Sequence, residues 1–318
     1  MDLSTKQPAT PEQTEDLMIL GSGPAGLAAA LYAARAELDP ILVTGMEPGG
    51  QVSRTNSIEN YPGFPEGISG AALGDLFQKQ AERFGARIEF DTITGVDLSK
   101  KPFAVRSYSR EYKTKTVIIA MGATPNHLKI PGEKEMIGKG VSYCATCDGH
   151  FFKGKPVIVV GGGDSAIEEG LFLTRYTTKV TIIHRRDSLR AGAILQERAF
   201  NNDKVNFIWD TVVTEIKGKN VLEAVHLRNV KTNAESDLAT EGVFIFIGHI
   251  PNTDLYKGQL ELDKKGYIKI DSHYQTSVPG VFAAGEAADP HYRQVITSAG
   301  MGAAAAIEVT RYLENMKK

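Results

Sequence analysis

The sequence predicts an α/β protein of two domains, each built on a parallel sheet, with the second domain inserted into the first. The chain has 318 residues, about twice the length of an ordinary domain. Two stretches, about 140 positions apart, each combine a short apolar strand, a glycine-rich turn and an apolar helix. A third apolar strand near the C-terminus is followed by a Gly-acid step. If this last strand joins the first sheet, the middle of the chain is an insertion.

The first stretch starts with the apolar strand 17–20. Gly21-x-Gly23-x-x-Gly26 and an Ala- and Leu-rich helix follow, and a second strand lies at 40–44. This is the spacing of a βαβ unit, and wholly apolar strands are typical of parallel sheets covered on both faces. In such a turn the first glycine permits the sharp bend, and the second lets a pyrophosphate approach the backbone. The third packs the helix on the strand.

The second stretch repeats this order. Strand 157–160 leads into Gly161-x-Gly163-x-x-Ala166 and a helix, and another strand follows at 179–183. Because both copies have a strand before the glycines and a helix after them, the sequence predicts two Rossmann-like dinucleotide-binding domains of the three-layer ββα kind. The alternative is a Rossmann-like fold whose glycines are only structural.

The C-terminal part should return the chain to the first domain. Residues 276–289 form a turn, an apolar strand and the Gly-acid step, and Gly300-x-Gly302 then leads into an Ala-rich helix. Two segments marked by Gly and Pro, 122–125 and 247–252, are candidate crossings or hinges between the domains. We therefore expect a flexible tail over 1–16, a first domain over 17–123 and 251–318, and an inserted domain over 124–250.

The composition argues against several kinds of partner. Lys and Arg number 36 against 38 Asp and Glu, so the formal net charge is -2. This balance offers no basic footprint for nucleic acid or for an anionic membrane. No apolar run approaches the roughly 18 residues of a membrane helix, and residues 1–16 lack the hydrophobic stretch of a secretory signal. We expect neither nucleic acid nor a membrane as a partner.

The two predicted nucleotide sites differ at the end of their second strand. In the inserted domain this strand ends in His184-Arg185-Arg186, and Arg190 follows four residues later. An NAD site usually presents an Asp or Glu here to the ribose 2′-hydroxyl, so a basic cluster indicates the extra 2′-phosphate of NADP. A solvated basic face at a strand end is the alternative.

The first domain has neither an acid nor a base at the corresponding point. Its second strand ends in Thr44-Gly45 and runs into the glycine-rich loop 46–51, with 60–65 beyond it. Such a loop brings the backbone close to a large flat ligand, and Gln51 could hydrogen-bond the edge of a ring. These features favour FAD over a nicotinamide nucleotide.

The only two cysteines form Cys144-Ala-Thr-Cys147, which Asp148 follows. Two intervening residues keep the sulfurs within disulfide reach, so the pair can cycle between dithiol and disulfide, and the Asp148 carboxyl could pass protons during that cycle. One alternative is an inert pair of buried thiols. The other is a metal site completed by His150, but structural zinc needs four ligands and no further cysteine exists, so no metal is expected. Such sparing use of cysteine indicates the cytoplasm.

From about Asp16 to Leu313 the chain resembles the low-molecular-weight thioredoxin reductases, the bacterial and plant type of the pyridine nucleotide-disulfide oxidoreductases. The motifs that carry the resemblance are GSGPAG, TGMEPGGQ, ENYPGFPEG, CATCDG, GGGDSAIEEG, HRRDSLRA, IGHIPNT, GVFAAGE and YRQ. The resemblance implies that NADPH reduces FAD, that FAD reduces the Cys144–Cys147 disulfide, and that the dithiol reduces thioredoxin. It also implies a homodimer and a rotation of the inserted domain between the half-reactions.

The resemblance assigns residues as well. Cys147 would face the flavin, Cys144 would attack the disulfide of thioredoxin, and Asp148 would be the acid-base residue. The implied FAD contacts are Gly21, Ser22, Gly23, Pro24, Ala25, Gly26, Thr44, Gly45, Gly49, Gly50, Gln51, Asn60, Gly122, Gly285, Glu286, Arg293, Gln294 and Val295. The implied NADPH contacts are Gly163, Asp164, Ser165, His184, Arg185, Arg186 and Arg190.

Two positions depart from the pattern of the family. Gly285-Glu286 stands where Gly-Asp is usual, and Met121 stands where Thr is common. The longer Glu286 side chain must still reach the ribityl hydroxyl of the flavin. Two other functions are open: a relative that uses ferredoxin as donor or another protein disulfide as substrate, and a flavin-bound scaffold whose redox pair signals. The intact basic cluster argues against the ferredoxin-dependent kind.

Overall fold

The computed structural model describes residues 14–55 and 57–316, which form two compact units. One unit, here unit 1, holds the chain up to Thr124 and from Ile250 onward, and unit 2 is Pro125–His249. Unit 2 is therefore inserted into unit 1, which agrees with the predicted fold class. Most of the expected tail, residues 1–13, lies outside the described residues.

The rest of the expected tail is wrong, because the first strand, β1, begins at Thr14. Thr14 and Glu15 pair in parallel with Lys113 and Thr114 of the neighbouring strand. The Asp16 carboxylate also lies 2.6 Å from a lysine ammonium on that strand. Polar side chains at the start of a strand can form hydrogen bonds and ion pairs with those of the neighbouring strand. The first apolar residue therefore does not mark the start of β1.

The main sheet of unit 1 has the strand order β3-β2-β1-β6-β5-β4, and β17 also pairs with β6. Strands β1, β2, β3, β6 and β17 run parallel, whereas β4 and β5 form an antiparallel extension. The pairing of β17 with β6 confirms that the C-terminal strand returns to the first sheet. The bounds are β1 Thr14–Leu20, β2 Ile41–Val43, β3 Arg87–Glu89, β4 Ile93–Asp97, β5 Phe103–Ser107, β6 Glu111–Ile119 and β17 Val281–Ala283.

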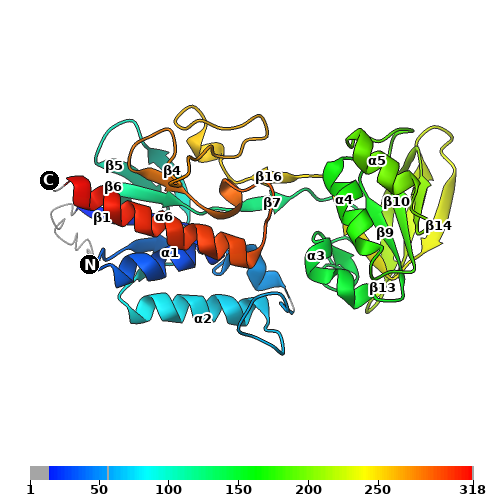
Figure 1. Ribbon diagram of the computed structural model, residues 1–318, viewed down its shortest axis with the longest axis horizontal. Coiled ribbons are helices and arrows are strands. Elements are labelled where there is room, and N and C mark those ends of the chain that lie inside the picture. Colours follow the sequence, from blue (N-terminus) through cyan, green and yellow to red (C-terminus); the bar gives the residue numbers. More distant parts are fainter. Residues whose placement is uncertain (1–13, 56, 317–318) are drawn as a thin grey trace, which may run out of the picture. The chain divides into compact units, whose positions relative to one another are not determined.

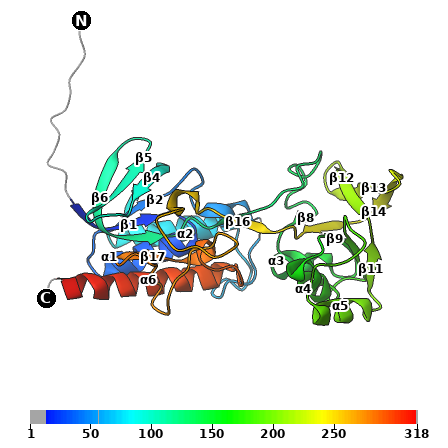
Figure 2. The same ribbon diagram turned by 90° about the horizontal axis from the view of Figure 1, so that it is seen from above.

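Two cores lie on opposite faces of this sheet, as the two-residue period of a strand requires. Leu17 and Ile19 of β1 pack with the helices, whereas Met18 and Leu20 face a second core with β4, β5 and the segment around Tyr256. The long helices are α1 Pro24–Arg35, α2 Gly70–Arg83 and α6 Val295–Met316, and short 3₁₀ turns lie at η1 Gly50–Arg54, η3 Asp254–Tyr256 and η4 Gly285–Ala287. Helices α1 and α6 run side by side along one face (Figures 1 and 2).

The helix α6 begins earlier than the sequence predicts. Gly300 and Gly302 lie within it rather than before it. Gly302 is where α6 crosses α1, since a Cβ added there would lie 1.9 Å from the carbonyl oxygen of Ala25. Gly302 therefore serves helix–helix contact, whereas a Cβ at Gly300 would meet no atom within 4 Å. The glycine pattern alone could not distinguish either position from a turn.

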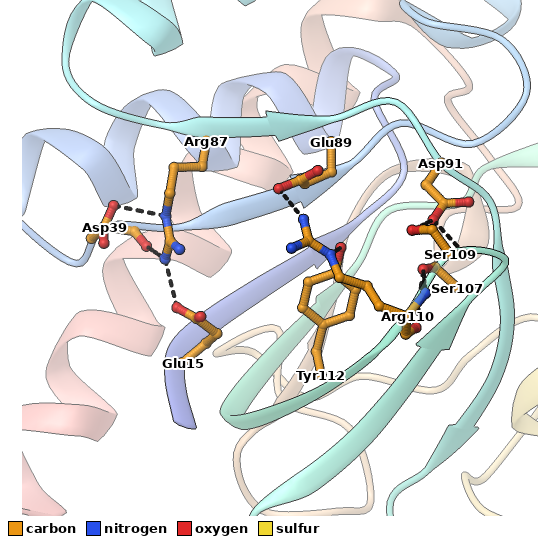
Figure 3. A network of polar contacts seen from close by, with 9 residues as sticks. All are labelled: Glu15, Asp39, Arg87, Glu89, Asp91, Ser107, Ser109, Arg110 and Tyr112. Atoms are coloured by element: carbon orange, nitrogen blue, oxygen red, sulfur yellow. Dashed lines mark hydrogen bonds and ion pairs between the residues drawn. The ribbon is translucent and has the colours of Figure 1, made fainter. Parts of the chain in front are cut away.

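Polar contacts connect β1, β3 and the hairpin formed by β5 and β6 (Figure 3). Arg87 contacts Glu15 of β1 at 2.5 Å and Asp39 after α1 at 3.0 Å. Further along, Arg110 pairs with Glu89 and donates to the hydroxyl of Tyr112. The network joins strands that are distant in sequence at the polar end of the sheet.

Unit 2 is a three-layer ββα domain. Its five-stranded sheet is parallel throughout and has the order β11-β10-β9-β15-β8. Helices α3, α4 and α5 lie on one side of it, and the three-stranded sheet β12-β13-β14 lies on the other (Figure 2). The bounds are β8 Val141–Ser142, α3 Ala145–Asp148, η2 Gly149–Phe152, β9 Pro156–Val160, α4 Asp164–Leu173, β10 Lys179–Ile183, α5 Ala193–Phe200, β11 Val205–Ile208, β12 Thr211–Gly218, β13 Leu222–Asn229, β14 Glu235–Ala239 and β15 Gly242–Ile245.

The two crossings between the units pair with each other. Strands β7 (Ala123–Pro125) and β16 (His249–Pro251) form a two-stranded sheet of their own. Asn126 donates its backbone N–H to the carbonyl of Gly248, 2.9 Å away, and Asn252 donates to that of Gly122, 3.0 Å away. Each asparagine thus fastens one end of the paired crossings. Among the described residues, no helix combines the length and the apolar character needed to cross a bilayer.

Candidate active site

Cys144 and Cys147 are joined by a disulfide, with their Cα atoms 5.3 Å apart. Strand β8 leads directly to Cys144, which caps the N-terminus of the short helix α3, and Cys147 lies within that helix. The helical turn brings the two sulfurs together across two intervening residues. Both side chains are partly exposed. A redox pair that exchanges electrons with an external partner requires such access.

Two donors surround the sulfur of Cys144. The backbone N–H of Cys147 donates to it at 3.2 Å, and the hydroxyl oxygen of Thr146 lies 3.3 Å from it. After reduction, both groups can stabilise a negative charge on this sulfur. These donors lie where the thiolate, the nucleophilic form of a cysteine, would need them.

The Asp148 carboxyl is held by Ser142, whose hydroxyl donates to it at 2.6 Å. Burial raises the pKa of Asp148, while the Ser142 hydrogen bond and His150 lower it to a smaller extent. The same Ser142 oxygen accepts the backbone N–H of Cys144 at 3.1 Å. One buried serine thus connects the carboxyl to the redox pair. Sequence reasoning missed Ser142, and its position two residues before Cys144 at the end of a strand is the signal that could have indicated it.

The glycine turn of unit 1 has two closely packed glycines and one open one. A Cβ at Gly21 would lie 2.4 Å from the carbonyl oxygen of Ala120, and one at Gly26 would lie 1.8 Å from that of Gly21. At Gly23, by contrast, a Cβ would meet no protein atom within 4 Å. Gly23 precedes Pro24 at the start of α1. Free space in front of a helix N-terminus fits a pyrophosphate group.

The loop that follows β2 is fastened to this turn. The buried Ser22 hydroxyl donates to the carbonyl of Thr44 at 3.0 Å and accepts the N–H of Gly49 at 3.2 Å. Gly49 and Gly50 adopt positive φ, and a Cβ at Gly50 would lie 2.9 Å from the Cα of Gly23. The contacts bring the predicted residues 44–51 to the glycine turn. Gln51, predicted to reach a ring edge, donates to the carbonyl of Ala123.

The C-terminal segment reaches the same turn. Gly285 has a φ of +69°, and a Cβ there would lie 2.9 Å from the Cβ of Ala25. Asn60 donates to the side-chain carbonyl of Gln294 at 3.1 Å, and Val295 begins α6. Burial raises the pKa of Glu286 to about 7, with Arg293 opposing this shift and Asp289 adding to it. The structure therefore brings together predicted FAD residues of three distant segments, and Glu286 lies among them as a carboxyl with a raised pKa.

The glycine turn of unit 2 also has one open glycine. Gly163 caps α4, and a Cβ there would meet only an Nη2 atom of Arg190, 4.0 Å away. The backbone N–H of Arg190 donates to the carbonyl of Gly162 at 2.7 Å, and the Asp164 carboxylate accepts the N–H of Gly192 at 2.7 Å. These two bonds fasten the basic segment after β10 to the turn. The side chains of Ser165, Arg185, Arg186 and Arg190 are exposed.

His184 differs from the other residues of the predicted basic cluster. Its side chain is only 5% exposed, and its ring lies against the backbone of Gly162 rather than in solvent. Burial lowers the pKa of His184, and Arg190, Arg186 and Arg185 lower it further. The three arginines thus lie on the surface near the turn, whereas His184 is buried inside unit 2.

Comparison with known proteins supports this description of the site. Residues 15–302 match the model of the family described as pyridine nucleotide-disulphide oxidoreductase. The chain is 47% identical over 311 residues to a thioredoxin reductase of Peptoclostridium litorale, covering 96% of this chain and 99% of that protein. It is 50% identical to a thioredoxin reductase of Rickettsia felis, covering 94% and 98%. The crystal structure of thioredoxin reductase from Streptococcus pyogenes shares 45% identity, with a TM-score of 0.91 over 96% of this chain and 99% of that one. On this evidence the chain belongs to the pyridine nucleotide-disulphide oxidoreductase family.

Proposed function

We propose that the protein is an NADPH-dependent thioredoxin-disulfide reductase that uses FAD. The observation that carries the proposal is the Cys144–Cys147 disulfide, formed by the only cysteines of a chain that also presents two open helix N-termini at glycine turns. A chain with a single glycine turn and a redox pair would offer a binding site for one nucleotide only. Two turns offer one site for a nucleotide that donates electrons and one for a flavin that passes them to the disulfide. Several relatives of high identity also bear the name thioredoxin reductase.

Unit 1 would hold FAD and unit 2 would hold NADPH. In unit 1 the turn 21–26, the loop 44–51 and the segment 285–295 converge around Gly23, and no arginine cluster follows β2. In unit 2 three exposed arginines follow β10 at the turn that ends in Gly163. Guanidinium groups at this point suit the 2′-phosphate that distinguishes NADPH from NADH. Bound flavin would supply the two-electron relay between reduced nicotinamide and the disulfide.

Within the redox pair, Cys144 would be the nucleophile toward thioredoxin. Its sulfur has two donors among the residues that the structure describes, the N–H of Cys147 and the hydroxyl of Thr146. Cys147 would face the flavin, as the resemblance implies. In the exchange, the Cys144 thiolate attacks one sulfur of the thioredoxin disulfide and forms a mixed disulfide. The Cys147 thiolate then attacks Cys144, which restores the internal disulfide and releases reduced thioredoxin with both electrons.

Asp148 would hold and deliver the proton that these steps need. Because burial raises its pKa, this carboxyl retains a proton to higher pH than an exposed aspartate does. Ser142 fixes its orientation through the 2.6 Å hydrogen bond. A proton held beside the redox pair can pass to the leaving sulfur when the disulfide opens.

Rotation of unit 2 about the paired crossings would let the redox pair and the nicotinamide take turns at the flavin. The glycines next to β7 and β16, Gly122 and Gly248, both have positive φ. Backbone of this kind can absorb a change of direction without steric cost. The side chains of Asn126 and Asn252 bond to carbonyls of the opposite crossing, beside Gly248 and Gly122, and so hold the two crossings together at both ends.

A second copy of the chain is the other partner we propose. Exposed apolar side chains occur on all three long helices of unit 1, among them Tyr32 of α1, Leu76 of α2 and Ile307 of α6. A homodimer interface would cover such side chains. Equilibrium ultracentrifugation of the full chain tests this, and a monomer at micromolar concentration would contradict it. The cytoplasmic location indicated by the cysteine usage stays a prediction.

The decisive experiment is a coupled assay of the purified flavoprotein with NADPH and thioredoxin, with NADH as control. Steady reduction of thioredoxin with NADPH supports the proposal. Reduction of the flavin absorbance by NADPH without thioredoxin turnover favours a scaffold or another disulfide partner, and no bleaching at saturating NADPH favours ferredoxin as donor. Cys144→Ser and Cys147→Ser should each abolish thioredoxin reduction and retain flavin reduction by NADPH. Turnover by either variant would contradict the assigned relay.

A further inference from the structure

The ring of His184 and the backbone of Gly162 occupy adjoining space at the base of the unit 2 turn. A Cβ built at Gly162 would lie 2.4 Å from both Cε1 and Nδ1 of His184 and 2.7 Å from its Cγ. These distances are far below van der Waals contact, and the ring cannot move aside easily because the side chain is 95% buried. The ring also lies against Trp209 in a T-shaped arrangement, with ring centroids 6.5 Å apart. The presence of His184 therefore requires a glycine at position 162.

The contact matters because Gly162 is the middle residue of the turn. On its carbonyl side the peptide of Gly162 accepts the backbone N–H of Arg190 at 2.7 Å. On its other side it rests on the His184 ring. One peptide thus connects the predicted pyrophosphate site at Gly163 with the arginine segment. A shift of the ring would move both parts of the site together.

The ring is buried against the turn, whereas the three arginines of this segment are exposed where an anion can reach them. Its Nε2 has no hydrogen-bond partner among the residues that the structure describes. The charged groups that face it are Arg185, Arg186 and Arg190, which together with burial lower the pKa of His184. A neutral, buried imidazole offers little attraction to a phosphate compared with three exposed guanidinium groups.

We infer that His184 is a positioning residue for the nicotinamide nucleotide. Its ring packs against Gly162 and so fixes the position of the turn relative to the arginine segment, and it does not contact the 2′-phosphate itself. The inference rests on the proposed function, since it concerns how unit 2 holds NADPH. It differs from the sequence prediction, which grouped His184 with the phosphate-binding arginines. It also explains why the second residue of this turn is glycine.

The test is a double-mutant cycle on the flavin-loaded enzyme with Gly162→Ala, His184→Ala and the combined variant. Binding of NADP⁺ and of NAD⁺ is measured by calorimetry, which needs no turnover. Gly162→Ala should weaken NADP⁺ binding about tenfold or more, because the new methyl group displaces the turn. The same substitution in the His184→Ala background should cost far less, because the ring that it would strike is absent. Equal losses in both backgrounds would overturn the inference.

A second arm distinguishes positioning from direct phosphate binding. His184→Ala should weaken NADP⁺ and NAD⁺ by similar factors, because the pyrophosphate site serves both nucleotides. His184→Phe, which retains a ring of similar size, should restore NADP⁺ binding to within about threefold of the wild type. Selective loss of NADP⁺ in both variants would make His184 a phosphate ligand and overturn the inference.

Failure of the proposed function gives a different result from failure of the inference. Wild-type enzyme that binds no NADP⁺ would contradict the proposed function. In that case thermal unfolding of the same four proteins still decides the pairing of Gly162 with His184. Gly162→Ala should lower the melting temperature less in the His184→Ala background than in the wild type, and equal shifts would overturn the pairing. The same melting data apply if Gly162→Ala alone folds poorly.

Discussion

The two glycine turns of the molecule share an open glycine but are built differently around it. In unit 1 the neighbour of the open glycine is Ser22, whose hydroxyl bonds to Thr44 and Gly49. In unit 2 the corresponding neighbour is Gly162, which packs on the ring of His184. One turn is fastened by hydrogen bonds to an uncharged loop, and the other rests on an aromatic ring beneath a basic segment. Under the proposed function, the shared motif would leave room for a pyrophosphate, and the neighbouring residue would tie each turn to the strand end that selects the rest of the nucleotide.

The third position of the motif offers the largest contrast. Gly26 leaves no space, since a Cβ would lie 1.8 Å from the carbonyl oxygen of Gly21, whereas Ala166 stands at this position in unit 2. We expect Gly26→Ala to destabilise unit 1 by about 3 kcal/mol or more and to abolish flavin retention. Thermal unfolding and the flavin-to-protein absorbance ratio measure both effects. The matched change Ala166→Gly should cost only about 1 kcal/mol, and similar losses in both variants would remove the contrast.

Buried titratable groups near the two turns offer a second contrast, in the dependence of stability on pH. The pKa of Glu286 is raised to about 7 from an unfolded value near 4.5, so its proton stabilises the folded state fully below pH 4.5. This stabilisation is lost as the pH rises through about 7, and at 1.36 kcal/mol per unit it amounts to roughly 3 kcal/mol at most. His184 has a lowered pKa and gives no loss over that rise.

Urea unfolding of nucleotide-free protein at about pH 5 and pH 8 tests this second contrast. The wild type should lose more stability between the two conditions than Glu286→Gln does, because glutamine has no proton to release. Parallel pH profiles for wild type and Glu286→Gln would show that the carboxyl is hydrated in the folded protein.

The strand ends give the third contrast, because three arginines follow β10 while Thr44-Gly45 follows β2. Replacing Arg185 and Arg186 together by alanine should raise KM for NADPH about 100-fold, since two charge-assisted contacts to the 2′-phosphate are lost. KM for NADH should change little, because NADH lacks that phosphate. Steady-state kinetics with both nucleotides measure the ratio, and an equal rise for both would refute the assignment of the arginines to the phosphate.

Sequence reasoning predicted the elements of this molecule better than its contacts. The strand-glycine-helix order predicted both Rossmann-like units and the return of the chain at β17, because apolar strands and glycine spacing are local signals. The start of β1 at Thr14 and the helical position of Gly302 depend on residues about 100 and 277 positions away, on β6 and at Ala25, so no local pattern announces them. The same holds for His184, whose burial follows from the fold around Gly162. Its neighbours in sequence are exposed arginines, and the grouping by sequence therefore treated it as one of them.

The smallest expected effect concerns Ser22. It tests whether the hydrogen bonds of Ser22 position the glycine turn of unit 1, as we infer that the His184 ring positions the turn of unit 2. Ser22→Ala removes one donor and one acceptor from a buried position and leaves the Thr44 carbonyl and the Gly49 N–H without this partner. We expect a loss of about 1–2 kcal/mol in stability and weaker flavin binding, with NADP⁺ affinity unchanged. Calorimetric titration of flavin and of NADP⁺ separates the two sites. Weaker binding of both flavin and NADP⁺ would mean that the two nucleotide sites do not form independently. Weaker binding of flavin alone shows that each turn depends on its own second residue.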